Sequence, residues 1–303
     1  MIYTVTLNPS IDYFVEMEQF IIGKTNRIVR EAKRPGGKGI NVSRVLKRLD
    51  VDTEAFGFIG GFTGRYIDEV LQEEGIRTDF ITVHGDTRIN VKLRVDTETE
   101  INGSGPAITE EENERLFAKL ERISEDDILV ISGSIPGSLP ADLYGRIAER
   151  TANRAGKLVV DTTKEYLLST LPYRPFLVKP NQDELGELFD ISIQSVEEAV
   201  PYGKKLVEMG AQNVIVSMGG LGALFFNHDY ALYANVPEGK LQNSVGAGDS
   251  VVAGFIAAYL QGKSVPEVFR YAVTAGSATA FSTGFCTSQL IEELIEQVHV
   301  TYL

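Results

Sequence analysis

Apolar positions along this chain follow two patterns that alternate. Short apolar runs, typical of buried strands, occur at residues 1–7, 55–59, 128–132, 157–161, 176–179, 214–218 and 223–227. Between them, segments with a helical period lie at 39–49, 64–74, 110–122, 141–155, 183–189, 195–209, 250–261 and 266–283. Strands that alternate with helices predict an α/β fold, a three-layer α/β/α domain with a mostly parallel sheet covered on both faces.

A second set of extended segments interrupts this alternation. Residues 14–18 and 27–33 have the pattern of strands, and residues 88–96 with 99–102 alternate like a hairpin. They predict a small accessory sheet, made of discontinuous segments near 13–34 and 87–103, attached to a single domain that spans the chain. Ligands of such folds bind beyond the carboxyl ends of the parallel strands.

Composition narrows the class of protein. The chain has 303 residues, of which 43% are hydrophobic and 23% charged, and this is typical of a soluble folded protein. Its net charge of -13 argues against nucleic acid as a partner. A single cysteine, Cys286, and scattered histidines argue against disulfides and transition-metal sites. The chain begins with a strand instead of a signal peptide, and its apolar runs are too short to span a membrane, so we expect a cytoplasmic protein.

Residues 24–48 nevertheless form a cationic island in this acidic chain. Arg44, Lys47 and Arg48 share one face of a predicted helix, and we expect them to be solvated. Lys38 lies among the glycines of Gly36-Gly-Lys-Gly39, just before the helix that contains Asn41, and is a better candidate for binding a ligand. The spacing is not that of a Walker loop.

The segment Asn243-Ser-Val-Gly-Ala-Gly-Asp-Ser250 leads directly into an apolar helix. Gly246 and Gly248 permit backbone conformations that let successive amide N-H groups converge at the helix start, where the helix dipole favours an anion. Asp249 would then stand where a base meets a phosphate. Taken alone, a glycine turn with Asp249 as the helix N-cap is the simpler interpretation.

Other candidate residues lie at the end of a predicted strand or on one of its faces. Asp12 follows the first strand and could accept hydrogen bonds from sugar hydroxyls, or it could simply form a turn. Arg88, Asn90 and Lys92 share one face of a strand, which is also the pattern of an exposed hairpin face.

Two more motifs have both a functional and a structural interpretation. Asn181 and Glu184 could hold Mg²⁺ beside nucleotide phosphates, or they could form a helix capping box. The turn Ser217-Met-Gly-Gly-Leu-Gly222 is typical of nucleotide binding and equally of a tight β-turn.

These motifs together resemble one family. GGKGIN at 36–41, SGSIP at 132–136, KPNQDE at 179–184, SMGGLG at 217–222 and VGAGDS at 245–250 are similar, in order and spacing, to motifs of the ribokinase/PfkB family of ATP-dependent carbohydrate kinases. The resemblance covers essentially the whole chain. It implies a ribokinase-like fold whose accessory sheet is a lid, with ATP and Mg²⁺ as cofactors.

The resemblance also implies roles for individual residues. Asp249 would be the catalytic base, and Gly246, Ala247 and Gly248 would form the anion hole. Asp12, Gly37, Lys38 and Asn41 would bind the sugar, with Arg88 and Ser134 at its phosphate. Lys179, Asn181, Ser217, Gly219, Gly220, Gly222 and Ser277 would line the ATP site, and Asn181 with Glu184 would support Mg²⁺. Asn243-Ser244 replaces the Asp-Thr of many relatives, which argues against K⁺ activation, although main-chain oxygens there could still bind the ion.

Within the family, the blocks at 1–13, 33–46 and 243–255 are most similar to bacterial kinases of fructose 1-phosphate. The expected reaction is transfer from Mg-ATP to the 6-hydroxyl of that sugar, giving fructose 1,6-bisphosphate. Tagatose 6-phosphate and fructose 6-phosphate are alternative substrates, and a non-catalytic sugar-phosphate sensor is an alternative of another class. Because a lid with an apolar inner face commonly pairs with a second lid, we expect a homodimer.

Overall fold

The structure is a computed structural model that describes residues 1–152, 154 and 156–303. The larger sheet contains, in spatial order, β15 (Val300–Tyr302), β14 (Ala231–Ala234), β13 (Ala223–Asn227), β12 (Asn213–Ser217), β11 (Leu177–Val178), β10 (Lys157–Asp161), β9 (Ile128–Ser132), β1 (Ile2–Thr6), β4 (Thr53–Ile59) and β5 (Arg77–Thr78), with β6 (Ile81–Thr82) also paired to β4. Strands β5 to β12 pair in parallel, and β12 to β15 pair antiparallel. The mostly parallel sheet predicted from the sequence is confirmed.

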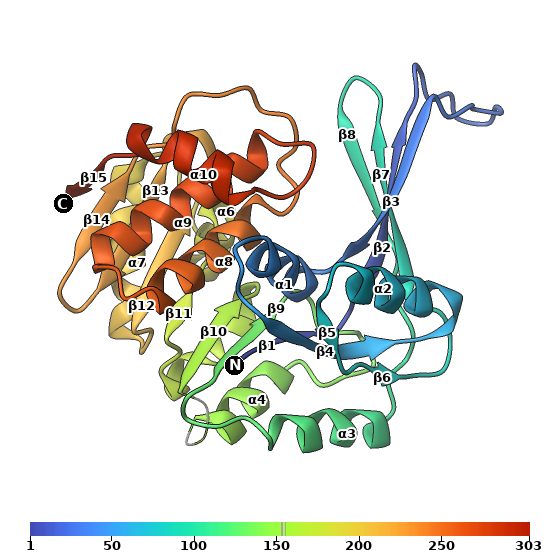
Figure 1. Ribbon diagram of the computed structural model, residues 1–303, viewed down its shortest axis with the longest axis horizontal. Helices are drawn as coiled ribbons and strands as arrows, with labels where there is room; N and C mark the ends of the chain where they lie inside the picture. The colour runs from blue at the N-terminus through green and yellow to red at the C-terminus, as the bar shows by residue number, and fades with distance from the viewer. Residues whose placement is uncertain (153, 155) are drawn as a thin grey trace.

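Helices cover both faces of this sheet (Figure 1). One face is covered by α1 (Lys38–Arg48), α8 (Ala247–Leu260), α9 (Val265–Ala280) and α10 (Ser288–Leu294), and the other by α3 (Glu110–Leu120), α4 (Leu143–Thr151), α5 (Lys164–Leu168), α6 (Gln182–Phe189) and α7 (Val196–Glu208). Side chains alternate along each strand, so neighbours such as Leu129 and Val130 belong to the two separate cores. The three-layer architecture is therefore confirmed.

The accessory sheet is a second, separate sheet. It contains β3 (Arg30–Gly36), β2 (Ser10–Glu16), β7 (Arg88–Arg94) and β8 (Glu98–Asn102), in that spatial order. Figure 1 shows these strands projecting away from the rest of the chain, with α2 (Gly61–Glu73) packed at their base. Its register aligns Asp12 with Arg34 on one side and with Asn90 on the other.

Several local predictions differ from the structure. Asp12 lies within β2 and not in a turn. The helix predicted to reach residue 283 ends at Ala280, whose carbonyl accepts hydrogen bonds from the amides of Gln242 and Asn243. The helix predicted at 141–155 is described only as Leu143–Thr151, and residue 155 lies outside the described residues.

Short elements were not predicted at all. They are α5, α10, β5, β6, β14 and β15, together with the 3-10 turns Leu171–Tyr173, Gly219–Leu221 and Ile295–Gln297. Such short segments carry too few residues for a period to be recognised, and packing against neighbours decides their conformation. Within the described ranges, no helix combines the length and the apolar character needed to cross a membrane.

Candidate active site

A cleft of about 720 Å³ opens at the carboxyl ends of the parallel strands, between the start of α8 and the accessory sheet. Thirteen of the predicted site residues line it: Asp12, Gly37, Lys38, Asn41, Arg88, Ser134, Lys179, Asn181, Glu184, Ser217, Gly246, Gly248 and Asp249. Residues more than 200 positions apart in the sequence are thus brought together. Asn90 and Lys92 line the same cleft, as their shared strand face suggested.

The remaining predicted residues lie outside this lining. Ala247 is the first residue of α8, between two glycines that do line the cleft. Gly219 and Gly220 belong to the 3-10 turn after β12, which Gly222 ends. Ser277 is buried in α9, where its hydroxyl donates a hydrogen bond to the carbonyl of Val273.

Asp249 lies in the first turn of α8, and the N-cap of this helix is Gly246, with φ +80°. The interpretation of Asp249 as an N-cap is therefore wrong. Its side chain is only 5% exposed, and the Nδ2 atom of Asn41 donates a hydrogen bond to its Oδ2 atom over 2.8 Å. Asn41, predicted to bind the sugar, thus contacts the candidate base directly.

The electrostatic environment perturbs the ionisation of Asp249. Burial raises its pKa to about 6, and the nearby charge of Asp161 acts in the same direction. Lys38, the hydrogen bond from Asn41, and Lys179 act in the opposite direction. A carboxyl group with a pKa near 6 can accept a proton close to neutral pH, which is what general base catalysis requires.

A network of opposite charges occupies the floor of the cleft. The Nζ atom of Lys38 lies 3.0 Å from Oδ1 of Asp161 and 3.3 Å from Oε1 of Glu184. The Nζ atom of Lys179 lies 3.4 Å from the same oxygen of Asp161. Burial alone would raise the pKa of Asp161, but the ammonium groups of Lys179 and Lys38 outweigh it and hold the pKa below its usual range.

Asp161 is a site residue that none of the sequence motifs indicated. It is the last residue of β10 and is 1% exposed, and its Oδ2 atom has no hydrogen-bond partner among the described residues. An acidic residue at the carboxyl end of a parallel strand is the signal that could have identified it.

Asn181 and Glu184 form the capping box that was the rival interpretation of this pair. The Oδ1 atom of Asn181 accepts a hydrogen bond from the amide of Glu184 over 2.8 Å, and Oε2 of Glu184 accepts one from the amide of Asn181 over 2.9 Å. The other oxygen of Glu184, Oε1, faces Lys38. No cluster of three or more acidic, histidine or cysteine side chains suited to a metal ion occurs in the part of the chain that the structure describes.

The accessory sheet presents its polar face to the cleft. Asn90 donates a hydrogen bond to Asp12 over 3.1 Å, and Lys92 pairs with Glu100 over 2.6 Å. Ile89 and Ile101, which are 42% and 58% exposed, lie on the opposite face. The expectation of an apolar inner face is therefore wrong, because the apolar side of this sheet points away from the cleft.

Arg88, predicted to bind the sugar phosphate, is engaged with the main chain. Its guanidinium donates hydrogen bonds to the carbonyl of Asn8 over 2.9 Å and to that of Gly103 over 3.2 Å. Burial lowers the pKa of this guanidinium. The side chain still lines the cleft, so it both joins β7 to the loop after β1 and places a positive charge beside the site.

The sequence and the fold are those of a known class of enzyme. The sequence model described as "pfkB family carbohydrate kinase" matches residues 5–292. The chain belongs to this family and is a sugar kinase.

Similar proteins within the family have names of their own. The chain is 55% identical over 303 residues to a 1-phosphofructokinase of Bacillus subtilis (strain 168), covering 100% of both chains. It is 40% identical over 304 residues to a D-tagatose-1-phosphate kinase of Bacillus licheniformis, again covering 100% of both. Among solved structures, phosphofructokinase-2 from Escherichia coli in complex with potassium superposes with a TM-score of 0.91 at 29% identity, covering 97% of this chain and 98% of that one.

Proposed function

We propose that this kinase transfers the terminal phosphoryl group of ATP to the 6-hydroxyl of D-fructose 1-phosphate, which yields fructose 1,6-bisphosphate and ADP. The observation that carries the proposal is Asp249: a buried carboxylate with a pKa of about 6, beside a glycine turn at a helix start, in a cleft of about 720 Å³. The choice of sugar follows the 1-phosphofructokinase relative, which matches over its whole length.

In this proposal Asp249 accepts the proton of the 6-hydroxyl as that oxygen attacks the phosphorus atom in line with the departing ADP. The amides of Gly246, Ala247 and Gly248 stabilise the negative charge of the transferring phosphoryl group. A Cβ atom on Gly248 would lie 3.2 Å from Nζ of Lys179, so an ammonium group adjoins this turn. No phosphoenzyme forms, because positioning and charge neutralisation suffice.

The residues of the cleft fit a magnesium ion carried by ATP. Mg²⁺ in kinases is commonly held by one or two carboxylates together with phosphate oxygens and water. Oδ2 of Asp161 is a buried acceptor without a hydrogen-bond partner among the described residues, and Oε1 of Glu184 has only Lys38. Asp161 and Glu184 would therefore hold the ion, in place of Asn181 and Glu184, because Asn181 uses its side-chain oxygen as a helix cap. When bound there, the ion would supply charge neutralisation at the phosphates.

The accessory sheet serves as the lid in this proposal. Its polar face, with Asp12 and Asn90 joined by a hydrogen bond, would contact the sugar hydroxyls, and Arg88 with Ser134 would face the 1-phosphate. A closed lid excludes water and so limits hydrolysis of ATP.

We further propose a homodimer that covers the apolar outer face of the lid. Ile89 and Ile101 are exposed on that face. Burying their apolar surface against a second copy of the chain would be favourable. Sedimentation analysis of the wild type and of Ile101→Asp tests this: the wild type should sediment as a dimer and the variant as a monomer. A monomeric wild type would remove the proposal.

The decisive experiment measures ADP release from Mg-ATP with fructose 1-phosphate, D-tagatose 1-phosphate, tagatose 6-phosphate, fructose 6-phosphate and unphosphorylated fructose. The highest kcat/KM is expected for fructose 1-phosphate. D-tagatose 1-phosphate is the second candidate, because the relative of that name is 40% identical over the full chain. A preference for a 6-phosphate would reverse the orientation of the sugar, and no turnover with any sugar would favour a sensor.

A further inference from the structure

Four positively charged side chains from the described part of the chain line the cleft, and they differ in what they contact. The ammonium groups of Lys38 and Lys179 share a buried carboxylate, and the guanidinium of Arg88 is bound to two main-chain carbonyls. The fourth side chain, Lys92, is paired with Glu100, whose side chain is 46% exposed. Among these four cations, Lys92 is therefore the one whose partner can move into solvent.

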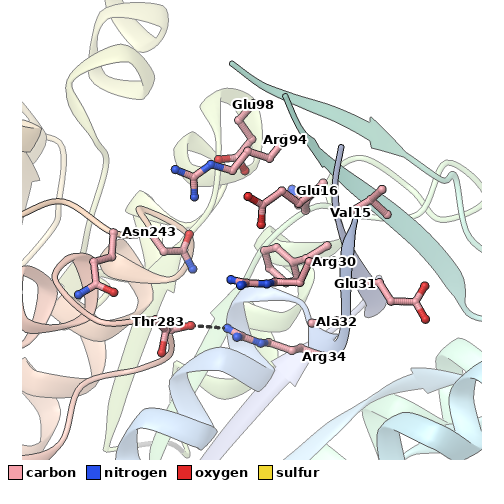
Figure 2. A pocket seen from close by; sticks show the side chains of 13 residues that line it. Val15, Glu16, Arg30, Glu31, Ala32, Arg34, Arg94, Glu98, Asn243 and Thr283 are labelled. Carbon is pink, nitrogen blue, oxygen red and sulfur yellow. Dashed lines mark hydrogen bonds between the residues drawn. The ribbon is translucent and has the colours of Figure 1, made fainter. Parts of the chain in front are cut away.

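Two arginines close to this wall of the cleft are already engaged elsewhere. The guanidinium of Arg34 donates a hydrogen bond to the carbonyl of Thr283, as Figure 2 shows. Arg44 is only 8% exposed and is paired with Glu74, so the expectation that it is solvated is wrong. Neither arginine lines the cleft, and Lys92 is the cation that the accessory sheet offers there with an exchangeable partner.

Lys92 lies one step along β7 from the residues proposed to bind the sugar. Alternate residues of a strand share a face and are about 7 Å apart, so Lys92 follows Asn90 on the face that lines the cleft. In register, Asn90 lies beside Asp12, whereas Lys92 lies beside Phe14. A phosphate group on a sugar held by Asp12 and Asn90 would come within reach of the ammonium group of Lys92.

The two members of the ion pair differ in freedom of movement. Lys92 is 8% exposed, and Phe14 provides an apolar neighbour for its stem. Glu100 belongs to β8, an edge strand whose five residues are all exposed. Because an ion pair with an exposed partner stabilises a protein only weakly, Glu100 can turn away at small cost. Lys92 cannot follow it into solvent.

The next row of side chains on this face of the sheet is balanced in charge. Across β3, β2, β7 and β8 its signs alternate, and Figure 2 shows the four side chains in the order Arg30, Glu16, Arg94 and Glu98. In the row of Lys92, the first two places belong to Ala32 and Phe14. Glu100 is therefore the only neighbour of opposite charge that Lys92 has in its row.

Glu100 places a negative charge in a cleft where, in the proposed function, two anionic substrates bind. Its two oxygens contact the ammonium of Lys92 over 2.6 Å and the amide of Asn102 over 3.3 Å. The hydrogen bond to Lys92 lowers the pKa of Glu100, so the carboxyl is ionised at neutral pH. Without Glu100, Lys92 would be a buried and unpaired cation, which is unfavourable unless another anion takes its place.

We propose that Lys92 is a specificity-determining residue: its ammonium group binds the phosphate of the sugar substrate, and this phosphate displaces the carboxylate of Glu100. Before the substrate binds, Glu100 neutralises Lys92, and afterwards it turns toward solvent. An unphosphorylated sugar cannot replace Glu100, because it carries no charge. Arg88 adds positive charge nearby but keeps its main-chain contacts. Only the identity of the sugar rests on the proposed function.

Calorimetric binding of fructose 1-phosphate, with Mg²⁺ and a non-hydrolysable ATP analogue present, tests this without turnover. Lys92→Met keeps an unbranched apolar stem and should raise Kd about 10- to 100-fold, as expected for loss of a hydrogen bond between charged groups. Lys92→Arg should recover part of the affinity. Glu100→Gln removes the competing charge and should lower Kd about two- to tenfold. A purely structural ion pair would instead give changes of the same sign for both partners.

The double variant Lys92→Met/Glu100→Gln separates displacement from simple repulsion. If Glu100 acts by occupying Lys92, its replacement should have no effect once Lys92 is gone, and the double variant should bind as weakly as Lys92→Met. An equal gain in both backgrounds would mean that Glu100 repels the phosphate directly, and would overturn the displacement. A gain in the binding of unphosphorylated fructose by Glu100→Gln would also contradict it.

Steady-state kinetics identify which substrate Lys92 contacts. In Lys92→Met, KM for fructose 1-phosphate should rise, while kcat and KM for ATP change less than about twofold. Arg94→Gln is the matched control, because it removes a charge from the next row of the same strand, outside the lining of the cleft. It should change none of these constants. Unchanged affinity for fructose 1-phosphate in Lys92→Met, or a rise in KM for ATP in its place, would overturn the inference.

The two proposals fail in different ways. A wild type that binds fructose 1-phosphate without phosphorylating it would end the proposed function, and the binding of the Lys92 and Glu100 variants would still decide the role of this pair. Normal phosphorylation by the wild type, together with unchanged affinity in Lys92→Met, would leave the proposed function in place and remove Lys92 from phosphate binding.

Discussion

The carboxyl group of Asp249 is buried, and its ionised form should make the folded protein less stable. Replacing Asp249 with asparagine separates this effect on stability from the role of the carboxyl group in catalysis. Asparagine has nearly the same shape, can still accept the hydrogen bond from Asn41, and carries no charge to bury. We therefore expect Asp249→Asn to fold, to be more stable than the wild type at neutral pH, and to lose roughly 10²- to 10⁴-fold in turnover.

The size of the stability change follows from the pKa. Folding raises the pKa of Asp249 from 3.8 to about 6. At about 1.4 kcal/mol per pKa unit, a rise of about 2 units favours the neutral over the ionised carboxyl by about 3 kcal/mol. The free energy of unfolding of Asp249→Asn should exceed that of the wild type by this amount once the wild-type carboxyl is ionised.

The direction of the pH dependence is fixed by the same shift. Because the pKa is higher in the folded state, the folded protein binds more protons than the unfolded chain between about pH 4 and about pH 6. The favourable contribution of the carboxyl is fully present below about pH 4 and is lost as the pH rises through about 6. The advantage of Asp249→Asn should therefore grow over this interval and remain constant above about pH 7.

Urea unfolding of both proteins at a series of pH values measures this difference, with turnover assayed on the same samples. Asp229→Asn is a suitable control, because Asp229 is 72% exposed and its replacement should change stability little at any pH. A variant that is less stable than the wild type, or a difference that does not vary with pH, would refute the reasoning. A folded variant with near-normal turnover would remove Asp249 from the role of base.

Two further variants test the surroundings of the base and the metal. Asn41→Leu removes a hydrogen bond that lowers the pKa of Asp249. The acid limb of the pH profile of kcat/KM should therefore move to higher pH. An unchanged acid limb would mean that Asn41 does not influence the base. Glu184→Gln should raise the Mg²⁺ concentration for half-maximal rate about tenfold or more while keeping the helix cap, since glutamine also serves in a capping box. Glu112→Gln, which alters the equivalent capping box of α3, should leave the Mg²⁺ requirement unchanged, and equal effects of the two variants would argue against Glu184 as a metal ligand.

Much of the fold could be predicted from the sequence because its signals are local. Each strand of the parallel sheet carries its own apolar run, and each long helix its own period, so the layers followed without knowledge of contacts. The glycine turn and Asp249 are also adjacent in the chain, and their proximity needed no tertiary information. Short edge strands such as β14 and β15 were missed because pairing with neighbours, and not their own pattern, defines them.

The sequence by itself determined the α/β architecture, the family and most of the residues that line the cleft, since these depend on periodicity and on contiguous motifs. Only the tertiary structure decided which charges meet: it paired Lys38 with Asp161 across 123 positions and Arg34 with the carbonyl of Thr283 across 249. It also made Gly246 the cap of α8 and placed Asp249 in the first turn of that helix, where it accepts a hydrogen bond from Asn41. Contacts between distant segments depend on how the sheet and its loops assemble, and no local pattern of residues encodes that arrangement.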